Sequence, residues 1–380
     1  MARTFFACSV AGLCIALAGA AAAQDILIGQ VSSRTSPTLA ANSNALYTGI
    51  NVYFDYVNQR GGIGGRKVVL VNTDDELKPA KMVELTGQFI ADKKVLALAG
   101  YQNTGGINEI SKQDIPAKAG IAMIAPFQGD RAIVGKTNFF PFRSGYPDEV
   151  TALVKEAQFT GKKKIVVVYQ NTSFGPPMMK LVQEQSKQMG LNVVDYVMID
   201  PSKPDQVVIR DAVASIDKHA PDGVIVLVGG RWVWELVKQI KSKSELDGTQ
   251  LYLLSIVPPQ DLVKAVGEQK ARGIVISQVV PYPFSATLPL VGEYQKMMKQ
   301  YAPDEPLSFA SLEGFVVGKI TVEALKRAGP KPTREKVLKA LNSMGELDLG
   351  GVYVNYTQKE RKGWGGVDLC VMGPNGKLLR

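Results

Sequence analysis

The sequence predicts an α/β protein built from two doubly wound, mainly parallel sheets, each in its own lobe. Three observations support this prediction. Strand-like and helix-like segments alternate along the chain, and the alternation restarts as a second series after Arg143. The short segment at residues 95–99 is wholly apolar, which is typical of a parallel strand covered on both faces.

The first series of elements occupies the N-terminal third of the chain. We expect strands at residues 25–31, 67–72, 95–99 and 121–124. Amphipathic or capped segments between them predict helices at residues 45–60, 79–92 and 107–118. Pro79 suits the first turn of its helix, where a missing N–H costs nothing.

The second series continues the same rhythm. We expect strands at residues 164–169, 192–198, 223–228, 251–254 and 274–280. The intervening helices are predicted at residues 148–160, 178–189, 207–219 and 232–242. Two helices at residues 289–301 and 308–328, and a third after Thr333, then follow without strands between them, and the tail predicts strands at residues 351–356 and 366–372.

The N-terminus predicts export. Arg3 provides a positive start, residues 5–23 are almost wholly small and apolar, and Ala21-Ala22-Ala23 forms a cleavage site ahead of Gln24. A buried or membrane-spanning helix is the alternative, but the richest apolar stretch is shorter than the roughly 20 residues that a span requires. We therefore expect residues 1–23 to be a signal peptide and the mature chain to work in the periplasm.

Charge and cysteine content narrow the class of protein. The formal net charge of the 380-residue chain is +9, but its Lys and Arg residues are scattered. We interpret the charge mainly as a solubility feature, with some preference for anionic ligands and no nucleic-acid partner. Only Cys370 remains after signal removal, so the mature chain has no internal disulfide, and its alternating surroundings predict a buried strand thiol.

Ligand-binding residues are expected on the loops that follow the parallel strands, because the carboxyl ends of such strands form a crevice. Asn103 and Thr104 open a helix after one strand, where N–H groups favour an anion, although an ordinary N-cap explains them equally well. Arg231 follows Gly229-Gly230 and suits a carboxylate, although a solvated arginine is as good an interpretation.

Enzyme signatures are weak. The single histidine, His219, removes most His-based metal sites and nucleophile triads. Asp74-Asp75-Glu76 could hold a metal, but its place before Pro79 favours capping of the next helix. We expect no enzymatic activity, no metal and no cofactor.

Several stretches resemble the type I periplasmic binding proteins, in particular the Leu/Ile/Val (branched-chain amino acid) receptor family of ABC importers. They cover the mature chain and are collectively specific: residues 58–67, Asp74-Asp75, Lys78-Pro79, residues 309–315, residues 323–329, Thr333-Arg334-Glu335 and residues 348–351.

This resemblance implies two α/β lobes joined by three hinge crossings, near residues 142–144, 277–280 and 363–366. The N-terminal lobe would comprise residues 24–142 and 279–363, and the C-terminal lobe residues 143–278 and 364–380. It also implies hinge closure over a small ligand, delivery to a membrane permease and a monomeric receptor. The ligand-binding positions would be Arg34, Asn103, Thr104, Phe127, Gln128, Phe174, Arg231 and Trp232.

The sequence departs from the family pattern where the ligand's ammonium is usually held. Val257 stands near the usual acidic position, Arg231 replaces a tyrosine and Arg34 lies in an altered first loop, although Glu313 could restore an acid. We therefore expect a carboxylate-bearing ligand, either an amino acid or an aromatic or other organic acid. The alternative function is a ligand sensor of the same shape that regulates a partner protein.

Overall fold

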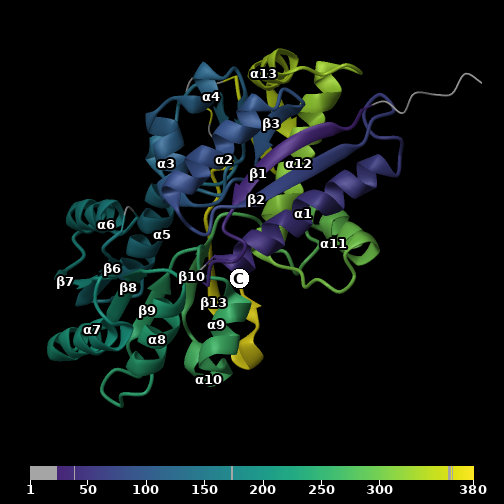
Figure 1. The fold of residues 1–380 in the computed structure, drawn as a ribbon. Coiled ribbons are helices and arrows are strands. Elements are labelled where there is room, and N and C mark those ends of the chain that lie inside the picture. The colour runs from purple at the N-terminus through teal and green to yellow at the C-terminus, as the bar shows by residue number, and fades with distance from the viewer. Residues whose placement is uncertain (1–23, 38, 173, 358–360, 362) are drawn as a thin grey trace, which may run out of the picture.

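The computed structural model describes residues 24–37, 39–172, 174–357, 361 and 363–380. Two α/β lobes lie side by side and are joined where the chain passes between them (Figure 1). This architecture confirms the predicted fold class. The predicted signal peptide, residues 1–23, lies outside the described residues.

The first lobe is organised around a parallel sheet with the strand order β2-β1-β3-β4-β5. Its strands are β1 (Ile26–Ser32), β2 (Val68–Asp74), β3 (Val95–Ala99), β4 (Ala122–Ile124) and β5 (Phe139–Phe140). The helices from this part of the chain are α1 (Ala40–Asn58), α2 (Pro79–Ala91), α3 (Thr104–Lys112) and α4 (Ile115–Lys118). Apolar side chains alternate between the two faces of the strands, so each face has its own buried cluster.

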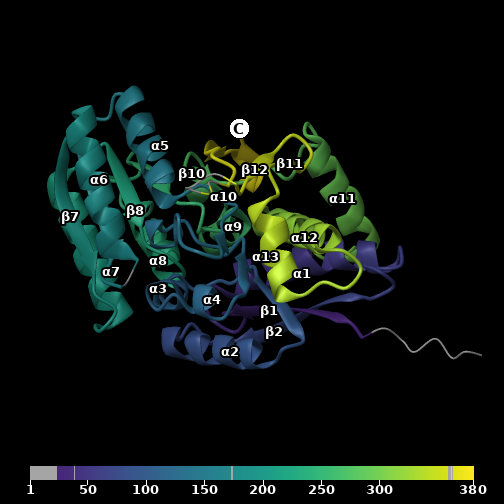
Figure 2. The same ribbon diagram turned by 90° about the horizontal axis from the view of Figure 1, so that it is seen from above.

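The second lobe contains a larger mixed sheet with the order β14-β13-β10-β9-β8-β6-β7. Its strands are β6 (Ile165–Gln170), β7 (Val193–Ile199), β8 (Gly223–Leu227), β9 (Gln250–Leu253), β10 (Val275–Gln278), β13 (Asp368–Met372) and β14 (Leu378–Leu379). Its helices are α5 (Tyr146–Phe159), α6 (Gly175–Met189), α7 (Asp205–His219), α8 (Arg231–Ile240), α9 (Pro259–Val266) and α10 (Glu268–Ala271). Helices α5 and α6 cover one face and α7, α8 and α9 cover the other, with α6 above and α7 and α8 below the strands in Figure 1. Figure 2 shows the same lobe from its α5 and α6 side.

The chain returns to the first lobe after β10. The returning elements are α11 (Pro289–Tyr301), α12 (Phe309–Ala328), α13 (Arg334–Asn342), β11 (Glu346–Asp348) and β12 (Tyr353–Asn355). Helix α12 packs along α1 so closely that a Cβ atom at Gly49 would overlap the Ser311 carbonyl oxygen. Strand β13 then pairs antiparallel with β10, so the sheet of the second lobe contains chain from a distant part of the sequence.

Most expected elements are present within the described residues, with bounds that differ by a few positions. The expected helix at residues 107–118 is divided into α3 and α4, because Asp114 adopts a left-handed conformation between them. Helices α9 and α10 and strands β5, β11 and β14 were not predicted. They are short, so they carry too little periodicity to be recognised.

The acidic trio at residues 74–76 does not cap α2, which corrects that prediction. The cap position is Lys78, and no side chain accepts a hydrogen bond from the start of the helix. Asp75 instead accepts hydrogen bonds from Ser33 Oγ at 2.6 Å and from Asn103 Nδ2 at 2.7 Å. This buried carboxylate therefore ties the ends of β1 and β3 to its own loop.

Two further observations concern Cys370 and the helices. Cys370 is a buried free thiol on β13, as predicted, and burial raises its pKa to about 11. In the part of the chain that the structure describes, no helix is long and apolar enough to cross a membrane.

Candidate functional site between the lobes

The first and third crossings are fastened to each other. Ser144 Oγ donates to the carbonyl oxygens of Trp364 and Gly366 at 2.7 Å, and the Trp364 N–H donates to the Phe142 carbonyl oxygen at 2.7 Å. Gly363 lies so close to Phe142 that a Cβ atom would overlap the Phe142 carbonyl oxygen. This tight contact fixes the position of the residues on either side, including Arg143.

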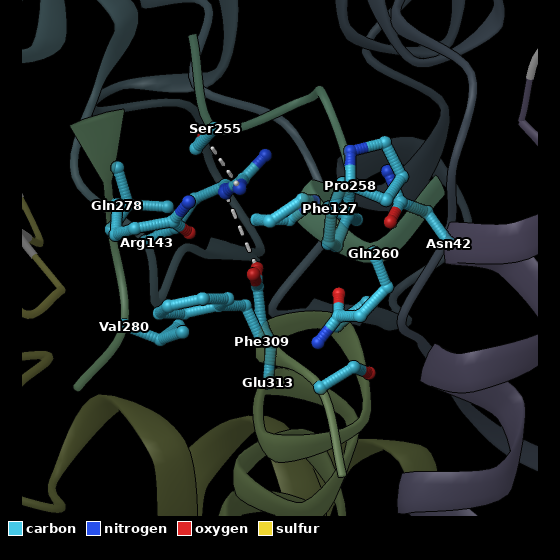
Figure 3. Close-up of a pocket in the computed structure, with 14 residues that line it drawn as sticks. Asn42, Phe127, Arg143, Ser255, Pro258, Gln260, Gln278, Val280, Phe309 and Glu313 are labelled. Carbon is cyan, nitrogen blue, oxygen red and sulfur yellow. Dashed lines mark hydrogen bonds and ion pairs between the residues drawn. The ribbon is translucent and has the colours of Figure 1, made fainter. Parts of the chain in front are cut away.

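Arg143 projects from the first crossing into the space where the lobes meet (Figure 3). Its Nε atom lies 3.3 Å from Oε1 of Glu313, and the two side chains are 2% and 3% exposed. One Nη atom donates to Ser255 Oγ at 3.2 Å, and the guanidinium lies 4.0 Å from the centre of the Phe127 ring. Arg143 therefore contacts α12 and the β4 loop of the first lobe and the β9 loop of the second.

A second buried carboxylate, Glu149 on α5, lies near this pair. It accepts hydrogen bonds from the Ser255 N–H at 2.9 Å, from Ser255 Oγ at 3.0 Å and from Ser277 Oγ at 2.6 Å. These three donors compensate for its loss of water. Ser255 thus connects Glu149 to Arg143.

Glu313 is less well compensated than Glu149. Burial raises its pKa, the Arg143 guanidinium opposes this rise, and the nearby Glu149 carboxylate adds to it, so that the pKa of Glu313 lies at about 7. Glu313 is therefore able to exchange a proton near neutral pH while it stays buried beside Arg143.

Three buried donors at this site have no hydrogen-bond partner among the described residues. They are Nε and Nη1 of Arg143 and Nε2 of Gln278, the last residue of β10. Nε faces Glu313 across the ion pair, whereas Nη1 and the Gln278 amide face no charged partner in that part of the chain. Both residues line the same cavity, and Gln278 is 1% exposed. Because an unpaired buried donor is costly, this arrangement favours an acceptor in the cavity that both side chains line.

The cavity has two adjoining parts. The inner chamber, about 20 Å³, is lined by Asn42, Phe127, Arg143, Ser255, Gln278, Phe309 and Glu313, with Pro258, Pro259, Gln260, Val279, Val280, Ser308 and Ala310. The outer chamber, about 260 Å³, is lined by residues of α1 and α9 and of the α11–α12 loop, among them Asn44, Ala45, Asp261, Met298 and Leu307. The chambers share Asn42, Pro258, Gln260 and Ser308, so they lie next to each other at that boundary.

A third cavity, about 730 Å³, shares Arg143 with the inner chamber and is also lined by Gln128, Arg131, Ser144 and Trp364. Two of its carboxylates already have local partners: Asp130 accepts from Asn108 and Ala132, and Asp148 from the Gly145 N–H. Its polar lining is therefore largely committed to the structure of its own loops.

The first-lobe residues predicted to bind ligand occupy different surroundings. Phe127 lines the inner chamber, and Gln128 lines the third cavity while donating to Asn108. Asn103 has a φ of 145°, accepts from the Gly106 N–H at 3.2 Å and donates to Asp75, so it does cap α3. The neighbouring Thr104 hydrogen-bonds to Tyr146 of the second lobe.

The remaining predicted positions lie outside the three cavities. Arg34 donates to Asn44 at 2.7 Å, and its guanidinium lies 4.1 Å from the centre of the Tyr47 ring. Phe174 packs edge-on against Tyr146, with ring centres 5.1 Å apart. Arg231 and Trp232 both hydrogen-bond to Asp205 at the start of α7.

Sequence reasoning did not assign a ligand role to Arg143 or Gln278, because Arg143 lies between β5 and α5 and Gln278 lies at the end of β10, outside the loops considered. A usable signal was present for Arg143, which is a lone charge after the apolar run at residues 139–142. Glu313 likewise interrupts a helix whose other early residues are small or apolar. A charge in an apolar segment is usually paired when buried.

The fold and the interlobe chambers define a two-lobed ligand-binding protein. Residues 25–369 match the family described as "Periplasmic binding protein", and the chain belongs to this family. The family and its relatives are substrate-binding proteins rather than enzymes, and membership implies a periplasmic location. Among the described residues, no group of three His, Cys, Asp or Glu side chains could hold a metal ion.

Individual comparisons agree with this assignment. The chain is similar to a substrate-binding periplasmic protein from Ralstonia solanacearum, at 28% identity and a TM-score of 0.86, over 93% of this chain and 99% of that one. An extracellular ligand-binding receptor from Verminephrobacter eiseniae gives 26% identity and a TM-score of 0.85, over 94% and 100% of the two chains. The Leu/Ile/Val-binding protein homolog 3 of Brucella melitensis is 28% identical over 49% of this chain, and the match spans about half of that relative's length.

Proposed function

We propose that this protein is the solute-binding receptor of an ABC importer and that it holds a small carboxylate-bearing ligand between its lobes. The lobes would be residues 24–142 with 279–363 and residues 143–278 with 364–380, and they would close about the three crossings. The ligand is an amino acid or an aromatic or other organic acid. The membrane permease of the importer would recognise the closed form of the monomeric receptor.

One observation carries this proposal: the inner chamber is bounded by both lobes and by the hinge. Asn42 and Phe127 come from the first lobe, Ser255 and Pro258 from the second, and Arg143 from the first crossing. A ligand there would contact all three parts at once, so its binding energy would favour the closed arrangement. The Asn42 side chain already donates to the Ile256 carbonyl oxygen across the cleft at 3.1 Å.

The ligand class follows from the same chamber. A guanidinium is a strong partner for a carboxylate, and aromatic side chains supply apolar walls for the rest of a small molecule. The similarity to a protein named as a Leu/Ile/Val-binding homolog supports an amino acid as one of the two ligand classes. Arg34, Asn103, Thr104, Phe174, Arg231 and Trp232 remain proposed contacts for ligands that bind farther along the cleft.

Calorimetric titration of the purified mature protein with amino acids and with organic acids tests the binding function. We expect at least one carboxylate-bearing compound to bind with one site per chain, and its uncharged amide analogue to fail. Deletion of the gene should then abolish uptake of that compound by cells. Tight binding with unchanged uptake would contradict the importer role and favour a sensor.

Export and oligomeric state have separate tests. N-terminal sequencing of the protein from the periplasmic fraction should begin at Gln24, because the predicted cleavage site ends at Ala23. Light scattering coupled to gel filtration should give the mass of one chain. A dimer mass that persists at low protein concentration would contradict the monomer.

A further inference from the structure

We propose that Arg143 and Gln278 receive the carboxylate of a monocarboxylate whose remainder is uncharged, and that Glu313 gives up its ion pair with Arg143 as this ligand binds. The inference rests on the proposed function, because it assumes a ligand between the lobes. It adds the anchoring residues, a narrower class of ligand and a proton that accompanies binding.

The unpaired donors indicate where the carboxylate of the ligand would bind. Nη1 of Arg143 and Nε2 of Gln278 are buried in the wall of the inner chamber, and neither has a partner among the described residues. A carboxylate provides two acceptor oxygens and so can satisfy both donors. The chamber's volume of about 20 Å³ is enough for one or two water molecules, which matches a carboxylate and excludes a bulkier group.

The outer chamber would hold the body of the ligand. Its volume of about 260 Å³ approaches the lower end of the range for small-molecule sites, and Ala45, Met298 and Leu307 supply apolar wall. Asp261 and Glu305 also line it, so a second carboxylate on the ligand would face like charge. This lining favours a monocarboxylate over a dicarboxylate.

The charge balance links binding to a proton. The charged groups that act on Glu313 are Arg143 from the first crossing and Glu149 from α5. With a bound carboxylate, one guanidinium would face three buried anions. Glu149 has three donors, whereas among the described residues Glu313 has only the Arg143 ion pair, and its pKa is already raised to about 7. Glu313 is therefore the carboxylate that becomes protonated.

Matched ligand pairs test the class of ligand by calorimetry on the full mature protein. The acids 3-phenylpropanoate and 4-methylpentanoate differ from phenylalanine and leucine only by the α-ammonium group. We expect one of the acids to bind at least tenfold more tightly than its amino acid, and succinate to bind more weakly than butanoate. Affinity should fall about tenfold for each pH unit above 7, because binding then requires proton uptake by Glu313.

Variants test the residues. Gln278→Met keeps the size of the side chain but removes the donor. It should lower the affinity for the acid at least tenfold. The double variant Arg143→Gln with Glu313→Gln removes the buried pair without leaving an unpaired charge. It should also lose the ability to bind the acid ligand. Glu313→Gln alone should retain binding and lose the pH dependence. Gln183→Met, on the exposed face of α6, is the control and should bind as the unmodified protein does.

The outcomes separate this inference from the proposed function. Undiminished binding of an acid to both Gln278→Met and the double variant overturns the inference and leaves the receptor function standing. Loss of binding in Glu313→Gln, with tighter binding of the amino acids, also overturns it, because Glu313 would then hold an ammonium group. If no acid and no amino acid binds, the proposed carboxylate ligand fails as well.

Discussion

Arg143 and Glu313 form an ion pair, with 3.3 Å between Nε and Oε1, at a point where both side chains are almost completely buried. Arg143 belongs to the first crossing and Glu313 to α12, so the pair joins the hinge to the first lobe. A buried pair of this kind is weak evidence of stability, because desolvation offsets much of the attraction. Because the pair lines the inner chamber, we assign it a role in ligand binding rather than in stabilising the fold.

The first prediction concerns the pH dependence of stability. The pKa of Glu313 is raised from 4.5 to about 7 in the folded chain, so the folded protein retains a proton that the unfolded chain has lost. Stability due to this group is therefore present below pH 4.5 and declines as pH rises to 7, by an amount on the order of 3 kcal/mol.

Thermal unfolding between pH 4.5 and 8 measures this effect. Glu313→Gln should flatten the decline, because its side chain does not titrate. The matched control is Glu184→Gln, which changes an exposed carboxylate on α6 and should leave the profile unchanged. Equal pH profiles for the unmodified protein and Glu313→Gln would rule out the assigned protonation.

The second prediction concerns the hinge. Gly363→Ala should destabilise the protein by about 1–3 kcal/mol, because its Cβ would overlap the Phe142 carbonyl oxygen and push the first and third crossings apart. Gly365→Ala is the control, since no atom lies within 4 Å of a Cβ there. Differential scanning fluorimetry distinguishes them. Similar melting temperatures for the two variants would mean that the crossings are not in tight contact.

The third prediction contrasts two helical glycines in the first lobe. Gly49→Ala should cost about 1–3 kcal/mol, because the added methyl would overlap the backbone of α12 and separate it from α1. Gly87→Ala, in an open position on α2, should instead stabilise the protein by up to about 1 kcal/mol through helix propensity. Denaturant unfolding followed by far-UV circular dichroism measures both. The same sign for both changes would contradict the α1–α12 contact.

The fourth prediction separates a structural role of Asn103 from a ligand role. Asn103→Ala and Ser33→Ala each remove one donor to Asp75, so both should lower the melting temperature. Asn103→Ala also removes the α3 cap and should cost about 1 kcal/mol more. If Asn103 contacts ligand, its variant alone should weaken ligand binding in calorimetry. Equal affinities for both variants would limit Asn103 to its structural contacts.

The fold could be predicted from the sequence because its signals are repetitive. Wholly apolar strands such as β3 and helices such as α12 carry enough periodicity to be recognised, and their order implies parallel sheets. Short elements such as β5 and α9 lack that periodicity. Their formation depends on tertiary contacts, such as the pairing of β5 with β4, that no local pattern encodes.

The candidate site was predictable only in outline. The family resemblance identified Phe127, which lines the inner chamber. It also selected Arg231, whose guanidinium the structure pairs with Asp205 on another helix. The anchoring role of Arg143 depends on the meeting of residues more than 100 positions apart, as its bond to Ser255 shows. Such long-range pairing cannot be read from a single sequence.

The most direct test of ligand binding between the lobes is the interlobe distance in solution. Spin labels at Asp55→Cys on α1 and Lys264→Cys on α9 would report it by pulsed electron resonance, because both positions are exposed and Cys370 is buried. A carboxylate ligand identified by calorimetry should shift the distance distribution to shorter, narrower values. An unchanged distribution at saturating ligand would contradict closure of the lobes over a ligand bound between them.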